Sequence, residues 1–160
     1  MTITCDTRSA AAVPTEALVS YVFEAEKDGV KPIDGVVEGL DQAAGGAFRR
    51  IADAGELTGK KFETTLLHFV PGLAAQRVLL MGAGKRDKFG SADLRRVAAV
   101  AARFLKARSI KNMAFLARED YRDAASAQAV TEGLLLGNFD GDKYRTDKKN
   151  GDAEQYRRAK

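Results

Sequence analysis

One short apolar run constrains the fold more than any other feature of this 160-residue chain. Arg77–Met81 reads RVLLM, and Gly82-Ala83-Gly84 follows it directly. A run of this length with almost no polar residue is typical of a strand in the middle of a sheet, covered on both faces. The sequence therefore predicts a layered α/β fold in which helices cover both faces of a buried sheet.

Other stretches rich in β-branched, aromatic and aliphatic residues predict the remaining strands. They are Ala17–Glu24 (ALVSYVFE), Phe62–Val70 (FETTLLHFV) and Asn112–Ala117 (NMAFLA), with a weaker candidate at Met1–Cys5. Pro71-Gly72 ends the second of these, and the short link to Arg77 permits an antiparallel pair with the next strand.

Helices are predicted between the strands from apolar residues spaced three and four apart. Asp34 can cap the first, whose apolar positions are Val37, Leu40, Ala44, Ala47, Phe48 and Ile51. Gly45-Gly46 interrupts it at a cost of about 1 kcal/mol per glycine, which suggests close packing there, and Gly55 is placed to end it.

Two further helices follow the RVLLM run. Ser91 is a suitable N-cap for the second helix, whose apolar stripe runs from Leu94 to Leu105. The third runs from about Asp123 to Phe139, with Ala127, Val130, Leu134 and Gly137 predicted on its inner face. The order of elements predicts a three-layer α/β/α sandwich with a mixed, mostly parallel sheet.

The charges divide the chain into a neutral body and a basic end. The net charge is +4, yet residues 1–142 contain equal numbers of basic and acidic side chains. All of the excess falls within 143–160, which holds seven Lys or Arg and three acids. We expect one domain at 1–146 and a basic linker or tail at 147–160. A neutral body disfavours a dedicated nucleic-acid-binding role.

The sequence offers few groups for chemistry. Cys5 is the only cysteine and His68 the only histidine, so internal disulfides and Cys/His metal clusters are excluded. No apolar run is long enough to span a membrane, and the N-terminus does not resemble a signal peptide. We therefore expect a cytoplasmic protein that makes no membrane contact.

The Gly82-Ala83-Gly84-Lys85 turn is the one candidate ligand site. Glycines between a strand and a helix let backbone amides approach a phosphate, so Gly82, Gly84 and Lys85 could bind a nucleotide. The turn matches neither the Walker pattern, because Arg86 follows Lys85, nor G-x-G-x-x-G, because Asp87 takes the third glycine position. A plain strand-to-helix turn is the favoured interpretation.

Three segments carry a resemblance to a known family. They are PGLAAQRVLLMGAGK (71–85), LRRVAAVAARFL (94–105) and EGLLLGNFDGDKYRT (132–146). In this order and spacing they resemble the N-terminal domain of the leucyl aminopeptidase (cytosol aminopeptidase) family. Phe139, Gly141 and Arg145 depart from that pattern, where the family has Tyr, Phe and Lys.

The resemblance implies a macro-domain-like fold in a chain that is not itself an enzyme. In the family, this domain packs on a C-terminal catalytic domain that binds two divalent ions (Zn or Mn). That domain hydrolyses N-terminal residues from peptides, usually in a hexamer. We expect a bacterial protein with assembly, substrate-access or regulatory roles and no catalytic or metal-binding residue of its own. Two alternatives remain open: a stand-alone domain that binds a nucleotide such as ADP-ribose, and a DNA-binding accessory domain.

Overall fold

The computed structural model describes residues 1–25 and 33–139, and the fold class and the succession of the four main strands along the chain are as predicted. The strands are β1 (Ala17–Val22), β2 (Thr64–His68), β3 (Arg77–Gly82) and β4 (Met113–Phe115). The α-helices are α1 (Gly35–Ala43), α2 (Ala47–Asp53), α3 (Ser91–Lys106) and α4 (Ala124–Asn138). Three 3-10 turns lie at Ala10–Ala12, Arg86–Lys88 and Glu119–Tyr121.

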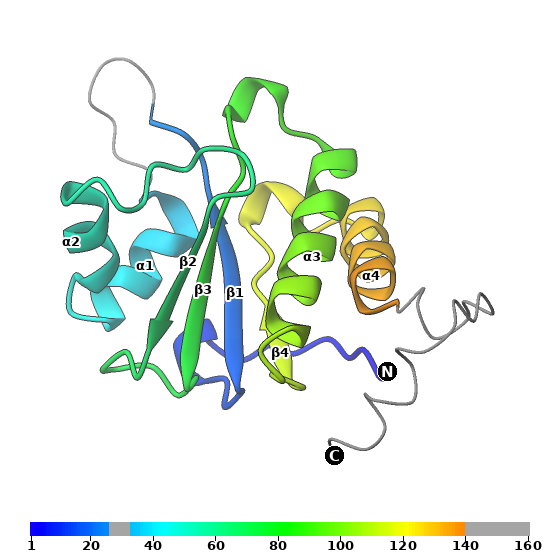
Figure 1. The fold of residues 1–160 in the computed structure, drawn as a ribbon, viewed down its shortest axis with the longest axis horizontal. Coiled ribbons are helices and arrows are strands. Elements are labelled where there is room, and N and C mark those ends of the chain that lie inside the picture. Colours follow the sequence, from blue (N-terminus) through cyan, green and yellow to red (C-terminus); the bar gives the residue numbers. More distant parts are fainter. Residues whose placement is uncertain (26–32, 140–160) are drawn as a thin grey trace, which may run out of the picture.

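The sheet is mixed and mostly parallel, in the order β2-β3-β1-β4. β1 runs parallel to both β3 and β4, while β2 pairs antiparallel with β3 in a hairpin. The helices α1 and α2 cover one face, and α3 with α4 covers the other (Figure 1). This is the predicted three-layer sandwich, with the RVLLM run of β3 in the interior of the sheet.

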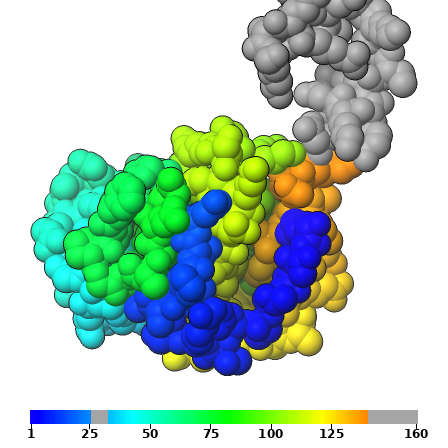
Figure 2. Space-filling model, turned by 90° about the horizontal axis from the view of Figure 1, so that it is seen from below, coloured from blue at the N-terminus to red at the C-terminus, as the bar shows by residue number. Residues whose placement is uncertain are grey.

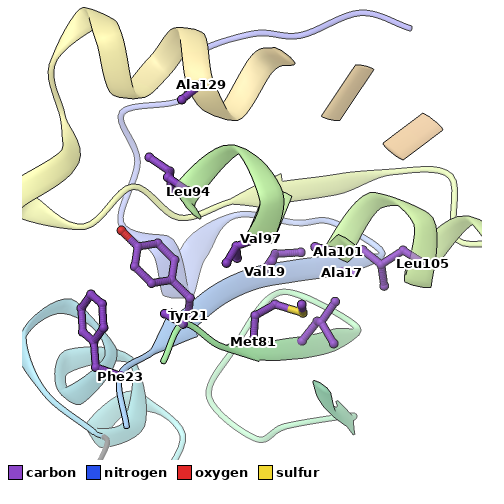
Figure 3. Close-up of a cluster of buried hydrophobic side chains, with 12 residues drawn as sticks. Ala17, Val19, Tyr21, Phe23, Met81, Leu94, Val97, Ala101, Leu105 and Ala129 are labelled. Atoms are coloured by element: carbon purple, nitrogen blue, oxygen red, sulfur yellow. The ribbon is translucent and has the colours of Figure 1, made fainter. Parts of the chain in front are cut away.

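Alternate residues of β1 and β3 belong to two separate hydrophobic cores, one on each face of the sheet. On the α3 side, Val19, Tyr21 and Met81 pack with Leu94 and other residues of α3 (Figure 3). On the α1/α2 side, Leu18, Val22, Val78 and Leu80 pack against Val37, Leu40 and Phe48. Burial on both faces explains why these two strands are continuously apolar in sequence.

The predicted first helix is in fact two helices. Gly45 (φ +62°) and Gly46 (φ +77°) adopt left-handed backbone conformations that end α1 and precede α2. The expectation that this pair marks close packing is wrong at Gly45, because nothing lies within 4 Å of where its Cβ would be. These glycines serve a turn instead, and the conformational freedom of glycine is what the turn uses.

Four smaller predictions need correction. Residues 1–5 form no strand, and the N-cap of α3 is Gly90 rather than Ser91, which is the first residue of the helix. Ala127 is exposed rather than on the inner face of α4, whereas Val130, Leu134 and Gly137 lie there as predicted, together with Ser126, Ala129 and Gly133. The strand at Asn112–Ala117 is shorter than predicted and half-buried, because β4 lies at the edge of the sheet. The predicted tail, 147–160, lies outside the described residues.

Candidate functional site

The carboxyl ends of β1, β3 and β4 meet at one edge of the sheet, where open α/β folds usually hold their ligands. β1 lies between β3 and β4, and the two crossovers that leave β1 and β3 run over opposite faces of the sheet. Segments that are far apart in sequence therefore converge here, including the start of α1 and the turns that follow β3 and β4 (Figure 1).

Arg118, from the turn after β4, fills the centre of this edge. Arg118 is 4% exposed, and its Nη1 donates to the Tyr21 carbonyl of β1 at 3.2 Å. Its Nη2 donates to Oδ1 of Asp34, the N-cap residue of α1, at 2.7 Å. Burial lowers the pKa of Arg118 from its ordinary value. The guanidinium therefore connects β1, α1 and the turn after β4.

Asp34 also pairs with a second arginine, Arg86, from the turn after β3. The sequence predicted that Asp34 caps α1. It does occupy the N-cap position, but its side chain makes no cap hydrogen bond and faces the two guanidinium groups instead. Arg86 extends the network to Asp120, with 3.5 Å between Nη1 and Oδ2. The segments that follow β1, β3 and β4 are thus joined by ion pairs, in which the acids Asp34 and Asp120 alternate with the two arginines.

Four aromatic rings surround the arginines: Tyr21, Phe23, Phe89 and Tyr121. The Arg86 guanidinium lies 4.4 Å from the centre of the Phe23 ring, and Arg118 lies 5.2 Å from the same ring. Tyr21 stacks on Phe89 with 5.2 Å between ring centres. Its side chain points toward Leu94 (Figure 3), and burial raises the pKa of its hydroxyl. Aromatic and charged side chains of the domain thus pack together at the carboxyl ends of the strands.

The predicted ligand turn lies beside this cluster. The backbone N–H groups of Gly82, Ala83 and Gly84 donate to the carbonyls of Glu63, Val22 and Gly59, respectively. These amides therefore already have acceptors within the domain. Gly84 and exposed Lys85 instead line a shallow depression of about 270 Å³. Its other lining residues are Glu24, Lys60, Lys61, Ala83, Lys88 and Asp93. Ligand binding by Gly82, Gly84 and Lys85 stays a prediction.

The remaining candidate groups lie apart from the strand-end cluster. His68 is exposed at the end of the edge strand β2, and Cys5 is exposed near the N-terminus. No group of three or more His, Cys, Asp or Glu residues within 1–25 and 33–139 could hold a metal ion. In the same part of the chain, no helix combines the length and apolarity needed to cross a bilayer.

Fold and site together define a macro-like α/β domain with an arginine–aspartate–aromatic cluster at the carboxyl ends of its parallel strands. The model of the cytosol aminopeptidase family, N-terminal domain, matches residues 19–148. The chain belongs to this family. A probable cytosol aminopeptidase of Solibacter usitatus is 40% identical over 146 residues, covering 91% of this chain and 27% of the relative. The cytosol aminopeptidase of Pseudomonas aeruginosa is 36% identical over 139 residues, covering 84% of this chain and 27% of the relative.

Solved structures support the fold. A mutant of tomato leucine aminopeptidase aligns with a TM-score of 0.63 at 23% identity, covering 86% of this chain and 28% of that one. A mutant macrodomain of Oceanobacillus iheyensis aligns with a TM-score of 0.54 at 13% identity, covering 83% and 76%. The chain thus spans about a quarter of the length of its aminopeptidase relatives, and most of a macrodomain.

Proposed function

We propose that this chain is the non-catalytic N-terminal domain of a metal-dependent leucyl aminopeptidase and serves assembly, substrate access or regulation of that enzyme. The observation that carries the proposal is the pairing of the charged groups at the carboxyl ends of the strands. Arg118 and Arg86 both pair with Asp34, at the end of the sheet where open α/β folds usually hold ligands. We take this pairing to be structural, so the proposal places no catalytic group in the cluster.

The chemistry of peptide hydrolysis belongs, in this proposal, to the part of the polypeptide that relatives carry beyond this domain. Two-metal hydrolysis needs ligands that clamp both the attacking and the leaving oxygen. The described residues bring no such set together, so we assign the two zinc or manganese ions to the catalytic domain. That domain is the expected partner, within a cytoplasmic homo-oligomer.

Activity assays on two proteins test this function. The 160-residue chain, supplied with zinc or manganese, should release no product from leucine p-nitroanilide, whereas the full-length Solibacter usitatus relative should. Peptidase activity of the purified 160-residue chain would contradict the proposal. Deleting the matched domain from the relative should change its oligomeric state or its KM. A deletion that leaves both unchanged would argue against an assembly or access role.

Nucleotide binding is the alternative function, and the lysine-lined depression is the observation that favours it. Lys60, Lys61, Lys85 and Lys88 surround it. Lys61 pairs with Asp93 at 2.7 Å, whereas Lys60, Lys85 and Lys88 are exposed. Titration calorimetry with ADP-ribose separates the two functions. A saturable heat of binding that disappears in Lys85→Ala would support nucleotide binding, whereas the absence of any heat of binding would rule it out.

A further inference from the structure

The lysine-lined depression, surrounded by Lys60, Lys61, Lys85 and Lys88, gathers positive charge from two separate segments of the chain. The first two lysines precede β2, and the other two lie in the turn between β3 and α3. The antiparallel pairing of β2 with β3 places the start of β2 beside the end of β3, which brings the two segments together. Several ammonium groups on one small surface create a positive potential that attracts anions.

Two acidic residues, Glu24 and Asp93, also line the depression and offset only part of this charge. Asp93 accepts a hydrogen bond from Lys61 Nζ at 2.7 Å, and its Oδ1 lies 3.6 Å from Nη1 of Arg96. This carboxylate is therefore already engaged with bases of the domain. The other three lysines are exposed, and four lysines against two acids leave an excess of two positive charges.

Gly84 keeps the space between the lysines open. It lines the depression, and its N–H donates to the Gly59 carbonyl at 2.9 Å, which fixes the turn after β3 against the segment before β2. Its backbone is left-handed (φ +77°), and a Cβ there would lie 3.3 Å from the Cβ of Lys61. A side chain at this position would be strained and would take up part of the depression. The backbone conformation thus preserves a hollow beside the lysines.

The size and the lining of the depression limit the ligand to a small one. Its volume of about 270 Å³ falls below the range of about 300–1,000 Å³ for pockets that bury a drug-sized ligand. None of its described lining residues is aromatic, and the nearby rings of Phe23 and Phe89 pack against Tyr21 in the strand-end cluster. A nucleobase would therefore find no ring to stack on. Lysine ammonium groups bind phosphate oxygens as point charges, through charge-assisted hydrogen bonds.

We propose that the lysine-lined depression binds a compact polyanion with at least two negative charges, such as inorganic pyrophosphate, through the ammonium groups of Lys60, Lys85 and Lys88. This inference does not depend on the aminopeptidase assignment. It differs from the nucleotide alternative because the depression holds phosphate groups and makes no contact with a nucleoside. Bound between the segment before β2 and the turn after β3, the anion neutralises charges that otherwise repel one another.

Titration calorimetry with inorganic pyrophosphate at fixed ionic strength tests the site. The chain should bind one equivalent, and the double variant Lys85→Gln/Lys88→Gln should bind about tenfold more weakly because it lacks two exposed charge contacts. Arg103→Gln/Lys111→Gln is the matched control, which removes two exposed positive charges at the other end of the domain and should bind within about twofold of the parent. Figure 2 views the domain from that end, where the yellow-green segment around residue 110 lies at the surface.

The position of the bound anion is checked separately by NMR. Pyrophosphate should shift the amide signals of Gly84 and Lys61, whereas the signal of Gly55, after α2, should stay in place. Shifts spread evenly over the exposed lysines of the domain would overturn the proposal.

Three calorimetric results would also overturn it. Without a saturable heat of binding there is no site, and equal weakening in both double variants would mean that only the overall charge attracts the anion. If ADP-ribose bound about tenfold more tightly than pyrophosphate, with the same dependence on Lys85 and Lys88, the depression would recognise a nucleoside. That last result would support the nucleotide alternative, and none of the three bears on the aminopeptidase assignment.

Discussion

At the scale of single residues, Arg118 connects three separate segments of the strand-end cluster. It is almost fully buried, and its two hydrogen bonds reach β1 and the N-terminus of α1. Burial makes the ionised form costly, and the Asp34 carboxylate offsets that cost. Losing the guanidinium would leave the Asp34 carboxylate and the Tyr21 carbonyl without this donor.

Replacing Arg118 by Met should therefore lower the free energy of unfolding by about 2–3 kcal/mol, less than for a fully buried pair because Asp34 is partly exposed. Met keeps most of the apolar stem, so the loss reports on the hydrogen bonds and the charge. Urea unfolding of both proteins measures it. Arg122→Met, at an exposed position nearby, is the control and should stay within about 0.5 kcal/mol of the parent. If the two substitutions changed the free energy of unfolding equally, the contacts of Arg118 would not stabilise the domain.

The sequence did not single out Arg118, and the reason is physical. An arginine after a short strand resembles any surface residue, and only the parallel pairing of β1 with β4 brings it beneath Tyr21. The position of Arg118 is predictable only from the topology, because side chains that follow parallel strands gather at the same end of the sheet. The sequence identifies Asp34 as a helix cap. Its two arginine partners could not be predicted, because each lies more than 50 residues from Asp34 in sequence.

At the scale of elements, the packing of α4 on α3 depends on glycines. A Cβ at Gly133 would lie 2.2 Å from the Arg95 carbonyl oxygen, and one at Gly137 would lie 2.3 Å from that of Ala99. Both contacts are with backbone atoms, which cannot rotate away. The two helices must separate to admit even a methyl group.

Gly133→Ala should thus destabilise the domain by about 1–3 kcal/mol, although alanine favours a helix by about 1 kcal/mol over glycine. The matched control is Gly39→Ala in α1, where nothing lies within 4 Å of the new methyl group and the gain in propensity should appear as stabilisation. Thermal unfolding by circular dichroism compares them. Opposite signs are expected, and stabilisation by both substitutions would show that α3 and α4 are not in close contact.

The elements best predicted from sequence are those with a strong apolar pattern. The stripe of α3 and the buried run of β3 are present as expected. The pattern failed at Gly45-Gly46, where the apolar spacing continues through a turn, because α1 and α2 pack on the same core. It also failed at Ala127, since alanine and leucine on all sides of α4 leave the inner face undetermined.

At the scale of the whole molecule, carboxylates hold together segments that are distant in sequence. Glu16, just before β1, accepts hydrogen bonds from the backbone N–H groups of Lys111 and Asn112 at 2.6 and 3.0 Å. Asp93 in the first turn of α3 accepts one from Lys61 Nζ at 2.7 Å. Hydrogen bonds from Asn112 and Lys111 lower the pKa of Glu16 below 4.5, and the bond from Lys61 lowers the pKa of Asp93 below 3.8.

The stability of the domain should accordingly fall in acid. A carboxyl group whose pKa is lower in the folded state stabilises that state fully above its unfolded pKa, and this contribution is lost as the pH falls toward the folded pKa. The free energy of unfolding should decline below the ordinary pKa of glutamate, 4.5. Urea unfolding at a series of pH values measures the decline. Glu16→Gln keeps an acceptor oxygen but cannot ionise, so its curve should be flatter in acid, whereas exposed Glu119→Gln should follow the parent. Parallel curves for all three proteins would mean that the contact between Glu16 and the strand before β4 does not depend on charge.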